Sequence, residues 1–202
     1  MKKIKLLLVT SNLLQGGAER QFVELIKGIN KDNFEITVLL YAVQKDVFFQ
    51  EIFSIPGITI IKNSLKNKFW IFKIIEALKF LHSFLKTNNF DLIFSLLFMN
   101  NLFVRLAAGK FYNNKIITGV RNNIKSYPKF YLIFEKFLIK NSFIVFNSEN
   151  AKNQFKSLFK KKFHKKLFII YNGYETKINY SDNKIDKDRL IIGCLGRQTN
   201  VK

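Results

Sequence analysis

Short apolar runs alternate with longer segments of helical periodicity along most of the chain. Runs such as Leu6-Leu7-Leu8-Val9 are short and rich in branched apolar residues, which is typical of buried strands. Between the runs, apolar residues recur every three or four positions, as at Phe22, Ile26 and Ile29, which indicates helices with one apolar face. The pattern predicts strands at 4–9, 34–41, 58–61, 91–96, 115–120, 143–146 and 167–170, and helices at 18–29, 69–86, 100–111, 127–140 and 149–159.

This alternation predicts an α/β fold in which a parallel sheet is flanked by helices. Strands joined by helices of this length pair in parallel, and helices then cover both faces of the sheet. Ligands of such folds bind where the strands end at their carboxyl edge. The loops expected to rim one crevice at that edge are 11–17, 97–101, 121–125, 147–150 and 171–175.

The composition of the chain changes after residue 175. Residues 176–189 are rich in Asn, Ser and Asp and poor in large apolar groups, so they are interpreted as a linker. A buried strand resumes at 190–195 and is followed by Gly196-Arg197. We therefore expect an N-terminal domain at 1–175, a linker at 176–189, and the first strand and loop of an incomplete, truncated second domain at 190–202.

Composition narrows the class of protein. Hydrophobic residues make up 48% of the chain, which excludes a disordered protein. The single cysteine, Cys194, excludes an internal disulfide and a thiolate metal cluster. Lys5 interrupts the first apolar run and no small-residue cleavage site follows, so a signal peptide is not expected. Because no apolar stretch reaches the ~20 residues that a spanning helix needs, we expect a cytoplasmic protein.

The formal net charge of +20 has two interpretations: a solvated basic surface, or attraction to an anionic partner such as a membrane surface, nucleotide phosphates or nucleic acid. Residues 151–166 contain seven lysines and no acid. Phe155, Leu158, Phe159 and Phe163 recur among these lysines at helical spacing, which predicts an amphipathic helix. That helix either docks on the core through its Phe face or lies on anionic lipid headgroups, peripheral to the cytoplasmic membrane face.

Three short motifs occur in order along the chain. Gly16-Gly17-Ala18-Glu19-Arg20 follows the first strand, Tyr171-Asn172-Gly173-Tyr174-Glu175 closes the first domain, and Gly196-Arg197 with Lys202 opens the second. Glycines before a helix let backbone amides approach an anion and are also typical of positive φ, although an ordinary strand–helix turn has the same appearance. The G-x-G-x-x-G fingerprint is absent, so a nicotinamide cofactor is not implied.

Together these motifs resemble the G-G-A-E-R, P-N-G-[IV]-[DE] and G-R-x(4)-K segments of family 4 glycosyltransferases. The resemblance implies the Rossmann-like N-terminal half of a GT-B fold. It implies transfer of a hexosyl or N-acetylhexosaminyl group, with retention, from a nucleotide sugar to a polysaccharide or lipid-linked acceptor in cell-envelope glycan synthesis. It implies no cofactor beyond the donor and no nucleic-acid partner. The catalytic carboxylates of the family lie in an E-x(7)-E motif of the second domain, so no catalytic residue is assigned here and the chain alone is expected to be inactive.

The resemblance also assigns roles to residues of this chain. It implies donor-phosphate contacts at Gly16, Gly17, Arg197 and Lys202. The residues expected to face the acceptor or line the cleft are Glu19, Arg121, Asn122, Asn123, Ser148, Asn172 and Gly173.

The sequence departs from the family pattern at two places. Arg121-Asn122-Asn123 stands where the family often has His, and Tyr171 replaces the usual Pro. Arg121 is therefore expected to bind the acceptor or the donor phosphates, or to pair with a carboxylate structurally. His82 and His164 are expected to be packing or surface residues, and no cluster has metal-ligand spacing. Alternative functions are a non-catalytic gene product or partner subunit, a basic nucleic-acid-binding module, and a fragment of a sugar-nucleotide epimerase, which the motif pairing disfavours.

Overall fold

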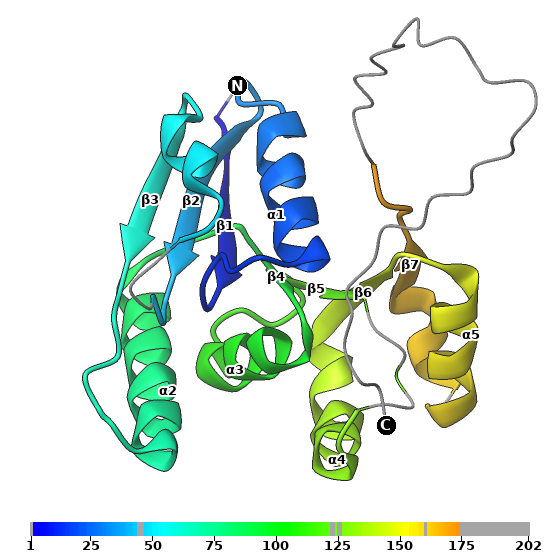
Figure 1. The fold of residues 1–202 in the computed structure, drawn as a ribbon. Coiled ribbons are helices and arrows are strands. Elements are labelled where there is room, and N and C mark those ends of the chain that lie inside the picture. The colour runs from blue at the N-terminus through cyan, green and yellow to red at the C-terminus, as the bar shows by residue number, and fades with distance from the viewer. Residues whose placement is uncertain (1, 44–46, 122–123, 125–126, 160, 174–202) are drawn as a thin grey trace, which may run out of the picture.

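The computed structural model describes residues 2–43, 47–121, 124, 127–159 and 161–173. All strands in this part of the chain form one parallel sheet, with the order β3-β2-β1-β4-β5-β6-β7 (Figure 1). The predicted strands are confirmed to within a residue or two. Their bounds are β1 (Ile4–Thr10), β2 (Phe34–Leu40), β3 (Ile58–Lys62), β4 (Leu92–Leu96), β5 (Ile116–Val120), β6 (Ser142–Phe146) and β7 (Leu167–Ile169).

The five predicted helices are also present, and short 3-10 turns accompany them. The α-helices are α1 (Gly17–Gly28), α2 (Trp70–Thr87), α3 (Phe98–Ala108), α4 (Lys129–Leu138) and α5 (Glu149–Leu158). The 3-10 turns are η1 (Gln50–Ser54), η3 (Ile139–Asn141) and η4 (Lys161–Lys166). The fold is the Rossmann-like α/β architecture that the sequence predicts. No helix among the described residues has the length and apolar character needed to cross a bilayer.

The helices divide unequally between the two faces of the sheet. The chain moves from β1 toward β3 through α1 and then moves back toward β7 through α2, α3, α4 and α5. Because parallel crossovers are right-handed, reversing the direction places the later helices on the opposite face from α1. Leu6 and Leu8 of β1 accordingly pack with α1 and η1, whereas Leu7 and Val9 pack with the later helices.

The expectation of one amphipathic helix over 151–166 is wrong. Helix α5 ends at Leu158, Phe159 is extended, and a separate 3-10 turn follows. A continuous helix would place Lys156 with Lys160, Lys161 with Lys165, and Lys162 with Lys166 at i,i+4, where like charges repel. Phe155 and Phe159 are buried in the core with ring centroids 4.2 Å apart, so these two side chains dock on the core.

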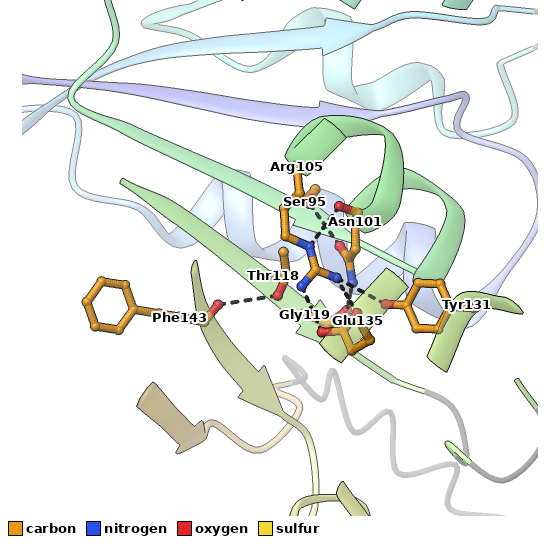
Figure 2. A network of polar contacts seen from close by, with 8 residues as sticks. All are labelled: Ser95, Asn101, Arg105, Thr118, Gly119, Tyr131, Glu135 and Phe143. Atoms are coloured by element: carbon orange, nitrogen blue, oxygen red, sulfur yellow. Dashed lines mark hydrogen bonds and ion pairs between the residues drawn. The ribbon is translucent and has the colours of Figure 1, made fainter. Parts of the chain in front are cut away.

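A buried ion pair joins α3 to α4 (Figure 2). The Arg105 guanidinium donates to Glu135 Oε1 at 2.7 Å and to Oε2 at 2.5 Å, and the two side chains are 1% and 2% exposed. Arg105 also donates to the Tyr131 hydroxyl at 3.2 Å and, through Nε, to the Asn101 carbonyl at 3.1 Å. This fork geometry uses both carboxylate oxygens of Glu135, which is the strongest arrangement for such a pair.

Asn101 extends this network into the sheet. Its amide nitrogen donates to the Gly119 carbonyl of β5 at 2.9 Å, and its amide oxygen accepts from Ser95 of β4 at 2.8 Å (Figure 2). Burial alone lowers the pKa of Arg105, but the Glu135 carboxylate outweighs burial, so the net pKa lies above the ordinary value. Burial and then Glu135 raise the pKa of Tyr131. Arg105 is therefore charged at neutral pH.

Breaking this pair should destabilise the protein strongly. Glu135→Leu leaves the Arg105 charge buried and unpaired, so the free energy of unfolding should fall by about 3–5 kcal/mol in urea denaturation. The double variant Arg105→Met/Glu135→Leu removes both charges and should recover most of that loss.

The exposed ion pair between Lys27 and Glu51, 3.2 Å apart, provides the matched control. Glu51→Leu should change the free energy of unfolding by less than about 1 kcal/mol, because solvent screens this pair. A double variant of Arg105 and Glu135 that is no more stable than Glu135→Leu alone would contradict the account.

Candidate functional site

A groove runs between the flank of α1 and the carboxyl end of β7. Its cavity volume is about 430 Å³. The residues that line it come from α1, from the end of β5 and from the segment after β7: Gln21, Glu24, Leu25, Gly28, Ile29, Arg121, Ile170, Tyr171 and Gly173. Segments more than a hundred residues apart in the sequence therefore form one site.

Two side-chain hydrogen bonds tie the groove together. Arg121 donates from Nη1 to Oδ1 of Asn172. Gln21 donates from Nε2 to the carbonyl oxygen of Gly173 at 3.0 Å. The last backbone hydrogen bond between β7 and β6 runs from the Ile170 amide to the Phe146 carbonyl oxygen at 2.9 Å. After Ile170 the chain leaves the sheet. Asn172 and Gly173 thus lie against Arg121 and α1.

Arg121 is a partly buried cation without a carboxylate partner in the described part of the chain. Burial lowers the pKa of its guanidinium, but the ordinary value is so high that the group stays charged at neutral pH. The ion pairs among the described residues join Lys27 to Glu24 and Glu51, and Arg105 to Glu135. A guanidinium carries five N–H donors, so donors remain for an anionic ligand after the bond to Asn172.

A second hollow lies at the amino end of α1. Its volume is about 650 Å³, and its lining consists of Gln15, Gly16, Gly17, Arg20, Phe48 and Phe49. Gly16 is the N-cap in an extended conformation and offers no side-chain acceptor to the first-turn amides. A helix amino end attracts negative charge, and the Glu19 carboxylate already lies over Gly16. A ligand group placed where a Gly16 side chain would stand would therefore meet the Glu19 carboxylate.

The glycine pair does not adopt the positive φ expected of it. Gly16 has φ of −164°, and the glycines with positive φ in the described residues are Gly57 and Gly109. A Cβ added at Gly17 would meet no atom within 4 Å. Gly17 begins a helix with ordinary backbone geometry, so the fold itself does not require glycine there.

The sequence model of Glycosyltransferase Family 4 matches residues 15–178. The chain belongs to glycosyltransferase family 4. Among solved structures it is similar to a UDP-N-acetylglucosamine 2-epimerase from Rickettsia bellii, with a TM-score of 0.61 and 10% sequence identity. The alignment covers 85% of this chain and 45% of that one, so the chain spans less than half the length of this structural relative. The comparison with curated proteins gives no match.

The structure of this family 4 domain divides the single crevice that the loops predict. Arg121 and Gly173 line the groove and Asn172 is hydrogen-bonded to Arg121, whereas Gly16 and Gly17 line the hollow at the amino end of α1. Ser148 is the N-cap of α5 and accepts from the Ala151 amide at 3.3 Å. Of the remaining predicted site residues, Asn122, Asn123, Arg197 and Lys202 lie outside the described residues.

Other predicted features have internal partners. The segment 97–101, predicted as a rim loop, instead forms the N-cap and first turn of α3, and there Asn100 donates to Thr10 Oγ1 at 3.2 Å and to the Leu96 carbonyl at 2.9 Å. A nitrogen of the His82 ring lies 2.9 Å from the Ala107 carbonyl oxygen. No group of three or more His, Cys, Asp or Glu residues among those described could hold a metal ion.

Sequence reasoning missed the contribution of α1 to the groove. Gln21, Glu24 and Gly28 lie at i, i+3 and i+7, so they form a stripe beside the apolar face of the predicted helix. That spacing is visible in the sequence. The fact that the segment after β7 crosses to this stripe is not visible there, because it depends on how the last strand ends.

Gly17→Val should leave the melting temperature nearly unchanged, because the added side chain enters open space; a change in unfolding free energy within about 0.5 kcal/mol is expected. Gly119→Val supplies the contrast, since a Cβ there would collide with the Leu96 side chain inside the sheet. That variant should lose about 1–3 kcal/mol. Strong destabilisation by Gly17→Val in thermal unfolding would contradict the geometry.

Proposed function

We propose that this chain provides the acceptor-side half of an enzyme that transfers a hexosyl or N-acetylhexosaminyl group from a nucleotide sugar to a polysaccharide or lipid-linked acceptor. The proposed setting is cell-envelope glycan synthesis at the cytoplasmic face of the membrane. Family membership supports the reaction class. The observation that carries the proposal for this chain is the Arg121 guanidinium, which faces the groove beside Asn172 without a carboxylate partner among the described residues.

The chemistry of sugar transfer requires such a cation. The bond between the anomeric carbon and the diphosphate oxygen breaks, the acceptor hydroxyl oxygen forms the new bond, and its proton is released. Negative charge develops on the departing diphosphate and is stabilised by fixed cations and backbone amides. We assign Arg121 to the acceptor or to the donor phosphates, and Asn172 and Gly173 to the acceptor side of the cleft. We assign Gly16, Gly17, Arg197 and Lys202 to the donor diphosphate.

Binding of phosphorylated ligands tests the role of Arg121 directly. Titration calorimetry of the 202-residue chain with uridine diphosphate and with undecaprenyl phosphate analogues of short chain length measures the affinity. Arg121→Ala should lower the affinity for one of these ligands by about tenfold or more, because a charge-assisted hydrogen bond is lost. Arg121→Lys should restore it only in part, since a point charge cannot replace the planar fork.

Lys86→Ala removes an exposed cation at the end of α2, far along the chain from the groove, and should leave the affinity unchanged. Equal affinities of wild type and Arg121→Ala for both ligands would remove Arg121 from the site. The reaction class is tested separately by mixing the enzyme with nucleotide sugar and acceptor. Release of nucleoside diphosphate supports transfer, whereas conversion of the nucleotide sugar to its epimer without an acceptor would identify an epimerase instead.

A further inference from the structure

Helix α4 buries Tyr131 and its carboxylate Glu135, whereas its largest apolar residues face outward. Tyr131 and Glu135 face the core, where they meet Arg105. The opposite face carries four large apolar side chains that are 44–67% exposed: Phe130, Ile133, Phe134 and Phe137. Their spacing of i, i+3, i+4 and i+7 places them in one stripe along the helix. Such a stripe ordinarily packs on a core, but here the core contact is made by the other side of the helix.

The start of α2 carries a second exposed apolar cluster. Phe69, Trp70, Ile71 and Phe72 are consecutive and 52–73% exposed. The loop before them is held in place by Glu76, which accepts hydrogen bonds from the backbone amides of Lys66 at 2.9 Å and Asn67 at 3.1 Å. The aromatic residues are therefore presented on an ordered turn. Figure 1 shows α4 and one end of α2 reaching the same lower edge of the molecule.

Lysines surround both clusters, and the acid nearest to each cluster is engaged within the protein: Glu76 accepts from the backbone amides of Lys66 and Asn67, and Glu135 lies in the buried ion pair. Lys129, Lys136 and Lys140 are exposed on or next to α4, and the one acid of α4, Glu135, is buried in its ion pair. Lys66 and Lys68 are exposed before α2. Residues 62–75 contain no acid at all. Large apolar side chains ringed by lysines match the interface of an anionic bilayer, where rings enter the headgroup region and ammonium groups meet phosphates.

We propose that the eight apolar residues of these two clusters, called here the α2–α4 aromatic surface, dock the protein on membranes that contain anionic lipids. Charge and apolar character together favour a membrane over the other occupants. A second copy of the chain would bring lysines of both copies together, and these would repel. Nucleic acid would attract the lysines but has no apolar phase into which Ile133 and Phe137 could be buried. The inference does not rest on the proposed function, because lipid binding is measured without turnover. Docking through the α2–α4 aromatic surface would hold that edge of the domain at the membrane, where a lipid-linked substrate would be anchored.

Trp70 is the one tryptophan of the chain and provides a direct readout. Phosphatidylglycerol-containing vesicles should shift its emission to the blue and protect it from acrylamide quenching, whereas pure phosphatidylcholine vesicles should do so much less. Added salt should weaken binding to the anionic vesicles, because it screens the lysines. Unchanged Trp70 emission on vesicles that do bind the protein would overturn the proposal, because the start of α2 would then lie outside the contact.

Single substitutions locate the surface. Phe137→Ser and Phe69→Ser should each lower the vesicle partition coefficient by about fivefold, and the double variant by about 25-fold, because each ring leaves the interface. Phe111→Ser is the matched control, since Phe111 is 58% exposed but lies after α3, outside the surface. Partition coefficients unaffected by Phe69→Ser and Phe137→Ser would overturn the proposal.

The charges are tested in the same way. Lys129→Gln/Lys136→Gln should lower the partition coefficient by about 25-fold, at about fivefold per lysine near an anionic surface. Lys152→Gln/Lys156→Gln removes equal charge from α5 and should have a smaller effect. A larger loss from the α5 pair would place the contact there and overturn the proposal. A concentration-dependent dimer that Phe137→Ser dissociates would also overturn it, because a second copy would then cover this surface.

Discussion

The buried ion pair between Arg105 and Glu135 sets the orientation of α4 against α3, on the face of the sheet that carries α2 to α5. Two charges removed from water are tolerated only when each satisfies the other, and here both carboxylate oxygens meet the guanidinium. Because Glu135 must point toward α3, Tyr131 points inward with it, and the opposite side of α4 is turned to solvent. The exposure of Phe130, Phe134 and Phe137 is thus a consequence of a polar contact in the core.

Arg105 and Arg121 show how the surroundings of an arginine determine its role. Arg105 is fully enclosed and meets a carboxylate, a hydroxyl and a carbonyl, so its charge is neutralised and its hydrogen bonds are used. Arg121 is only partly buried and meets the Asn172 amide oxygen, which carries no charge to balance it. The first arginine stabilises the fold, and the second retains a charge that an anion can use. This contrast supports the proposal that the groove beside Arg121 binds an anion.

Periodicity in the sequence predicts the strands, the helices and the parallel sheet, because each strand is short and buried and each helix has an apolar stripe. It also predicts that Arg121 and Asn172 lie at the carboxyl edge, since both follow strands. It cannot predict which side of α4 faces inward, because Leu132 and Ile139 are apolar as well as Phe130 and Phe137, and the buried polar pair decides the matter. The contact between Gln21 and Gly173 joins positions 152 residues apart, and no local pattern encodes it.

Positive charge by itself does not distinguish a membrane-binding surface on this protein, because lysines are abundant throughout the chain. The segment at 151–166 has the densest lysines, yet Phe155 and Phe159 are buried in the core, so these two rings cannot enter a bilayer. Helix α4 has fewer lysines, but the Phe130, Phe134 and Phe137 rings beside them are exposed and are not packed in the core. Electrostatic attraction to headgroups is weakened by salt, whereas burial of exposed rings is not, so the two together hold a protein at an interface where either alone is insufficient. The exposed apolar surface, more than the number of lysines, is what singles out α4 and the start of α2.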